Sequence, residues 1–134
     1  MKPCINVLTL GVDDLVRSLA FYRDGLQVPQ ELIAQADDHF ALHLREDFSL
    51  VFFERSAIAA LIGRAPGASS ASEHIIGHAA ASKDEVDGIL RSAKAAGGTV
   101  IGSPKVEPWG YMGHFLDPDG HLWEIWWNPS ATNE

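Results

Sequence analysis

The sequence lacks the features of a secreted, membrane-spanning or nucleic-acid-binding protein. A single cysteine, Cys4, among 134 residues excludes an intrachain disulfide and a cysteine-based zinc cluster. Basic residues are scarce too, because 10 Lys and Arg stand against 18 Asp and Glu and give a formal net charge of -8, which repels polyanions. No apolar run approaches the roughly 20 residues that span a bilayer. We therefore expect a cytoplasmic protein that binds neither nucleic acid nor a membrane.

What the sequence does contain is the composition of a folded domain and an ordered series of elements. Hydrophobic residues make up 46% and charged residues 21%, as in an ordinary globular protein. Residues 4–12 are apolar and β-favouring, and residues 14–25 carry large apolar side chains at helical spacing. Three more extended runs follow, at residues 30–36, 40–44 and 49–54. The first half of the chain therefore predicts a strand, a helix and three strands.

A connecting segment, about 56–73, leads to a second half with the same order of elements. Residues 74–81 are typical of a strand, and Ser82 with Glu85 forms an S-x-x-E capping box that predicts a helix over about 83–96. Extended runs follow at residues 99–101, about 105–109, 112–116 and 122–127. Residues 117–120, Asp-Pro-Asp-Gly, have the preferences of a type I turn between the last two runs.

The two halves resemble each other as an internal repeat. A constant offset of 71 residues places Val7 on His78 and Leu19 on Leu90. Neither half has enough faces to cover its own sheet, so we expect one domain over residues 1–134. Its modules would be about 4–55 and about 74–128. The predicted fold class is α+β, with two β-α-β-β-β modules whose curled mixed sheets surround a shared cleft and whose helices lie outside.

The segment that ends the second module holds the most informative polar residues. Glu124 lies in the middle of an apolar strand, where an unpaired carboxylate would be costly, so it needs a cation, a metal or a hydrogen-bonding partner. The turn over residues 117–120 sets His114 opposite Glu124, with their Cβ atoms about 5 Å apart. A third polar residue, His78, lies in the apolar strand of residues 74–81.

Two imidazoles and a carboxylate suit a divalent metal ion, because neutral histidine and carboxylate are ligands that Zn, Mn, Fe, Ni and Co accept. We therefore predict a metal site formed by His78, His114 and Glu124, with His114 and Glu124 also as catalytic groups. The alternative is that His78 is an ordinary strand histidine without a metal.

These motifs resemble the vicinal oxygen chelate superfamily, which includes glyoxalases, bleomycin-resistance proteins and extradiol dioxygenases. The resemblance covers about residues 5–128 and rests on three stretches, which are Leu8 to Leu15, Gly77-His78 and Asp117 to Glu124. It implies a homodimer, a small-molecule ligand and metal ligands at positions that fall on Val7, His78 and Glu124. Valine cannot bind a metal, so this chain departs from the pattern at the first position.

Two functions follow from the resemblance and remain open. One is a metalloenzyme of the glyoxalase, lyase, transferase or dioxygenase kind, acting on a substrate with neighbouring oxygens. The other is a metal-free protein of the bleomycin-resistance type that binds or sequesters a small molecule. The predicted ligand-contacting residues combine hydroxyl, imidazole and aromatic groups. They are Thr9, His43, Trp109, Tyr111 and Trp126.

Overall fold

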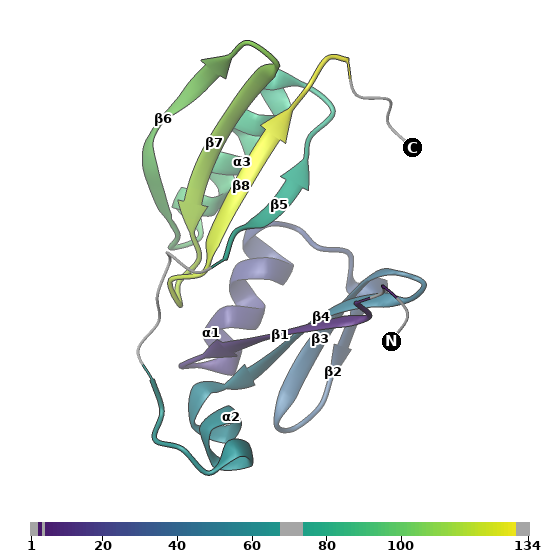
Figure 1. Cartoon of the computed structure of the whole chain (residues 1–134), viewed down its shortest axis with the longest axis vertical. Coiled ribbons are helices and arrows are strands. Elements are labelled where there is room, and N and C mark those ends of the chain that lie inside the picture. The colour runs from purple at the N-terminus through teal and green to yellow at the C-terminus, as the bar shows by residue number, and fades with distance from the viewer. Residues whose placement is uncertain (1–2, 4, 68–73, 131–134) are drawn as a thin grey trace. The chain divides into compact units, whose positions relative to one another are not determined.

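The computed structural model describes residues 3, 5–67 and 74–130 of the chain, shown in Figure 1. The chain divides into two compact units, Met1–Ala68 and Ser69–Glu134. Each unit contains one four-stranded mixed sheet and follows the order strand, helix and three strands. The predicted α+β class with two β-α-β-β-β modules is thereby confirmed, whereas the shared cleft stays a prediction. Cys4 lies outside the described residues.

The first unit has the strand order β1-β4-β3-β2, in which β1 pairs in parallel with β4. Its elements are β1 (Val7–Val12), α1 (Leu15–Ala20), the π-helical turn η1 (Phe21–Gly25), the 3₁₀ turn η2 (Gln30–Leu32), β2 (Ile33–Gln35), β3 (His39–Arg45), β4 (Phe48–Glu54) and α2 (Arg55–Ile62). Asp14 is the N-cap of α1, because its carboxylate accepts a hydrogen bond from the Arg17 amide at 3.1 Å. The predicted helix over residues 14–25 continues after Ala20 as the wider turn η1.

The core of the first unit lies on one face of its sheet. Leu10, Phe52 and Phe40 stand side by side on β1, β4 and β3, and each is at most 3% exposed. The rings of Phe40 and Phe52 stack with centroids 4.4 Å apart, and Tyr22 packs on Phe52 from the helical side. Since side chains alternate along a strand, the neighbouring positions, such as Thr9, belong to the opposite face of this sheet.

The second unit has the strand order β5-β8-β7-β6, with β5 parallel to β8. Its elements are β5 (Ile76–Ala79), α3 (Lys83–Ala95), β6 (Thr99–Glu107), β7 (Gly110–Leu116) and β8 (Leu122–Trp127). The Ser82 half of the capping box is confirmed, because the Ser82 hydroxyl accepts from the Glu85 amide at 3.0 Å. The Glu85 carboxylate accepts from the amide of Ala81, one residue before the cap, instead of from that of Ser82. The runs expected at 99–101 and about 105–109 form one strand, β6, with a register shift between Ile101 and Lys105.

α3 covers one face of the second sheet (Figure 1). On this helix-facing side Phe115 and Ile125 are 0% and 1% exposed, and Gly113 lies against Leu90 of the helix. The odd-numbered residues of β7 and β8 therefore face α3. Their even-numbered neighbours form what we call the open face of the second sheet.

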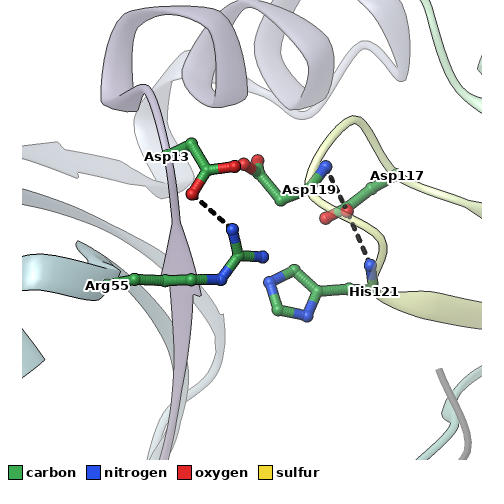
Figure 2. A network of polar contacts seen from close by, with 5 residues as sticks. All are labelled: Asp13, Arg55, Asp117, Asp119 and His121. Atoms are coloured by element: carbon green, nitrogen blue, oxygen red, sulfur yellow. Dashed lines mark hydrogen bonds and ion pairs between the residues drawn. The ribbon is translucent and has the colours of Figure 1, made fainter. Parts of the chain in front are cut away.

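The turn between β7 and β8 sets the register of these two strands. One carboxylate oxygen of Asp117 accepts hydrogen bonds from the amides of Asp119 and His121, both at 2.9 Å (Figure 2). The Gly120 amide donates to the Asp117 carbonyl at 3.0 Å, and Gly120 has a φ of 87°, which glycine adopts without strain. This closed turn places His114 directly opposite Glu124, as predicted.

The repeat differs from the prediction in its strands. Counted from the residues that cap the helices, Asp14 and Ser82, the offset between the units is 68 residues rather than 71. The buried strand residues agree, because Val12 at 0% exposure then matches Ala80 at 4%. An offset of 71 still aligns the buried helical positions Leu19 and Leu90. The two offsets differ by an odd number, so an offset of 71 aligns residues of β1 and β5 that belong to opposite faces of their sheets, such as Val7 and His78.

Candidate functional site

His114 and Glu124 form a hydrogen-bonded pair in the middle of the open face. His114 Nε2 lies 2.9 Å from Glu124 Oε2, and the two side chains are 26% and 30% exposed. An ionised carboxylate only accepts hydrogen bonds, so Nε2 carries the hydrogen and donates it. The remaining imidazole nitrogen, Nδ1, and the second carboxylate oxygen are then the groups that a ligand can address. His114 is thus the hydrogen-bonding partner that Glu124 requires in the middle of an apolar strand.

Aromatic and aliphatic side chains flank the pair on the same face. Trp126 and Met112 occupy the next row of the sheet, opposite each other on β8 and β7. Trp109, in the turn before β7, is 41% exposed and meets Trp126 edge to face, with ring centroids 6.4 Å apart. On the other side of the pair, Ile101 stands opposite His114 and is 46% exposed. The open face therefore combines one polar pair with accessible apolar surface.

Small residues on β5 border this group on one side. Gly77 and Ala79 stand beside Glu124 and Trp126, respectively, in the parallel pairing with β8. A Cβ placed on Gly77 would lie 3.8 Å from the Trp126 indole nitrogen, at ordinary contact distance. Backbone and a methyl group thus border the carboxylate and the indole.

His78 is not brought together with His114 and Glu124. It pairs in register with Ile125, which faces α3, so His78 belongs to the helix-facing side of the sheet. The predicted set of three metal ligands is therefore not assembled by this sheet. Within residues 3, 5–67 and 74–130, no three His, Cys, Asp or Glu side chains are grouped in a way that could hold a metal ion.

The residues present also do not fit the ligand set that the resemblance implies. The implied first ligand falls on Val7, and the 68-residue offset makes Ile75, not His78, its equivalent in the second unit. Both side chains are aliphatic and offer no donor atom. Of the implied ligand positions, Glu124 is the one on the open face that carries a donor atom, and its carboxylate is engaged by His114.

Tyr111 also lies on the helix-facing side, away from the pair. Its hydroxyl donates to the Asp87 carboxylate of α3 at 2.6 Å, and the Lys83 ammonium lies 4.8 Å from the centre of its ring. The hydrogen bond to Asp87, aided by burial, raises the pKa of Tyr111 to about 12. These contacts join the helix to the sheet, so the structure does not place Tyr111 among the groups on the open face.

The predicted residues of the first unit lie on the face of its sheet opposite the core. Thr9 stands beside Val51, and His43 stands opposite Ser49. A ring nitrogen of His43, Nδ1, is 2.7 Å from the Ser49 hydroxyl. Ligand contact by Thr9 and His43 stays a prediction.

Arg55 and Asp13 form an ion pair in the first unit that the sequence does not predict (Figure 2). It connects the residue after β1 with the first residue of α2, 42 positions later in the chain. A Cβ on Gly11 would lie 2.8 Å from the Arg55 side chain, so the absence of a side chain at Gly11 leaves the space that Arg55 occupies. No local pattern indicates such a pair, because its members meet only after β1 and β4 have paired.

Comparison with known proteins identifies the family. The model of the Glyoxalase/Bleomycin resistance protein/Dioxygenase superfamily matches residues 4–125. A glyoxalase-related enzyme from Fulvimarina pelagi is similar with a TM-score of 0.82 and 26% identity, over 95% of this chain and 89% of that one.

Two further solved structures share the fold at lower identity. A hypothetical protein from S. aureus has a TM-score of 0.78 and 23% identity over 94% of each chain. A lactoylglutathione lyase from Agrobacterium tumefaciens has a TM-score of 0.65 and 21% identity over 93% of each chain. No curated protein matches the sequence significantly. The family match covers most of the chain, and so the chain belongs to the Glyoxalase/Bleomycin resistance protein/Dioxygenase superfamily.

Proposed function

We propose that this protein binds a small, flat organic molecule on the open face of its second sheet, without a metal ion held by the protein. The observation that carries the proposal is the His114–Glu124 pair at 2.9 Å, surrounded by accessible apolar side chains. The proposed ligand carries a positive charge or a strong hydrogen-bond donor, because the free carboxylate oxygen of Glu124 accepts hydrogen bonds. Of the two functions that the sequence leaves open, this is the metal-free binding of a small molecule.

The aromatic neighbours support a planar ligand. Trp126 and Trp109 meet edge to face, so an aromatic molecule can pack against an indole while its polar group reaches Glu124, two residues from Trp126 on β8. Indole faces also attract cations, by about 0.5–1 kcal/mol at exposed sites. Charge and shape thus favour the same class of ligand, a planar organic cation.

The second candidate is a metal-assisted enzyme of the vicinal oxygen chelate type. It is favoured by the close approach of one nitrogen and one oxygen donor on the open face, since histidine and carboxylate both bind divalent metals. It requires further ligands from water or substrate, because Val7 and Ile75 supply none. The donor set is therefore a poorer fit to this function than to metal-free binding.

The test uses N-methylquinolinium as the planar cation and quinoline, at pH 8, as its neutral counterpart, with binding followed by tryptophan fluorescence and calorimetry. We expect the cation to bind more tightly than quinoline. Glu124→Gln should weaken cation binding about tenfold, the effect of losing roughly 1.4 kcal/mol, and leave quinoline unchanged. Glu31→Gln removes the same charge from an exposed turn in the first unit and serves as the control.

Thermal melts with Mn, Co, Ni and Zn separate the two candidates. A metal ion at 100 times its dissociation constant would stabilise the fold by about 2.7 kcal/mol. The proposal expects no shift that depends on Glu124. Equal binding of the cation by the Glu124→Gln variant would refute the proposed site, and a metal-induced stabilisation lost in that variant would favour the enzyme.

A further inference from the structure

A cavity lies within the second unit, between α3 and β6, on the side of the sheet away from the His114–Glu124 pair. Its volume is about 480 Å³, within the range of sites for small organic ligands. Leu90 of α3 together with Val100 and Pro104 of β6 supplies its apolar lining. Val100 pairs with the helix-facing Phe115, which places the cavity on the side covered by α3.

The irregularity of β6 accounts for this cavity. Ile101 pairs with His114 and Lys105 with Met112, so three residues of β6, numbers 102–104, stand against the single residue Gly113 of β7. Gly102 has a φ of 63° and has nothing within 4 Å of the position of a Cβ. The strand therefore bends away from its regular course beside the helix and leaves space there.

Two cations border the cavity. Arg91 and Lys94 lie three residues apart on α3, a spacing that places side chains on the same face of a helix. In the described part of the second unit neither has a carboxylate partner. The one acidic residue of the lining, Asp87, already accepts the hydrogen bond of Tyr111. In a chain of net charge -8, this is a local concentration of positive charge.

From these features we infer that the cavity between α3 and β6 binds a small organic anion. The anionic group lies at Arg91 and Lys94, and a short apolar or aromatic body rests on Leu90, Val100 and Pro104. The arrangement provides charge complementarity at one end and apolar surface at the other, as small carboxylic acids require. This ligand is opposite in charge to the one proposed for the open face, and its cavity lies on the other side of the sheet.

The test uses 2-naphthoate as the anion and 2-naphthamide as a neutral molecule of the same shape, followed by calorimetry and by shifts of backbone amide signals in NMR. We expect naphthoate to bind with shifts confined to α3 and β6, and naphthamide to bind at least about fivefold more weakly. Arg91→Gln and Lys94→Gln should each weaken naphthoate binding by about the same factor. Arg45→Gln, which removes an exposed cation from the first unit, should have no effect.

Three results would overturn the inference. Equal binding of naphthoate and naphthamide would mean that the cations take no part. Amide shifts on the open face instead of on α3 and β6 would place the anion elsewhere. Absence of naphthoate binding at millimolar concentration would mean that the cavity takes no such ligand. Both glutamine variants retain the long side chain on an exposed helical surface, so their fold can be verified by circular dichroism.

Discussion

The hydrogen bond between Tyr111 and Asp87 provides a sharp test of the structural role assigned to Tyr111. Tyr111→Phe removes the hydroxyl alone, because the phenylalanine ring keeps its packing on the sheet and its position beneath Lys83. The 2.6 Å hydrogen bond to a carboxylate belongs to the strong class, which contributes about 1.5–3 kcal/mol. Asp87 is only half-buried and regains water when the hydroxyl is lost. We therefore expect the free energy of unfolding to fall by about 1.5 kcal/mol.

The measurement is urea unfolding of the parent protein, Tyr111→Phe, Asp87→Asn and the double variant. The coupling energy between the two positions should account for most of the loss, whereas a coupling near zero would refute the assignment. The pH dependence gives a second readout. The pKa of Tyr111 is raised to about 12 in the folded state, so the unfolded chain releases this proton first and stability falls as pH rises from about 10 to about 12. In Tyr111→Phe, the part of the fall in stability with pH that is due to Tyr111 should be absent. Its affinity for N-methylquinolinium should equal that of the parent protein, because Tyr111 lies on the face of the sheet opposite Glu124.

Three further predictions concern stability and assembly. Ser82→Ala should lower the free energy of unfolding by about 1 kcal/mol in urea titrations, because it removes the hydroxyl that caps α3, and Ser82→Asp should retain most of it. Gly113→Ala should cost about 2 kcal/mol by overpacking, since the new Cβ would lie 2.5 Å from Leu90 Cδ1, and a thermal melt unchanged from the parent would contradict this reasoning. The homodimer implied by the family resemblance predicts twice the monomer mass in sedimentation at micromolar concentration, and a single species of 14.6 kDa would exclude it.

The pairing of His114 with Glu124 could be predicted from sequence because a tight turn leaves a hairpin only one register. The side chain of Asp117 closes that turn locally, so no distant part of the chain is needed. The same register rule sets Tyr111 opposite Trp127, and alternation then assigns both to the face opposite Glu124. The signal for the position of Tyr111 was therefore present in the sequence, although its aromatic character suggested a ligand contact instead.

The face of His78 could not be predicted in this way. His78 was predicted as a ligand because it is a polar residue in an apolar strand and because the resemblance places a ligand there, and neither observation fixes its face. Aligning the two halves does not fix it either, because large apolar residues recur in the helices and the helical pattern dominates that alignment. Moving a helix by three residues relative to its strand nearly preserves its buried side, since three residues are close to one turn, but it reverses the facing of every strand residue. The contact of Trp109 with Trp126 could not be predicted from the sequence either, because it depends on the path of the turn between β6 and β7.

The bend in β6 has a consequence for how this protein behaves at high concentration. β6 is an edge strand of its sheet, and an unbroken edge presents a row of free amides and carbonyls to which another chain can add. Here residues 102–104 interrupt that row, and Pro104 has no amide hydrogen to offer. The opposite edge strand, β5, is only four residues long. Strand addition at either edge is thus discouraged, so the sheet resists amyloid-like growth without requiring a further protein element to cover it.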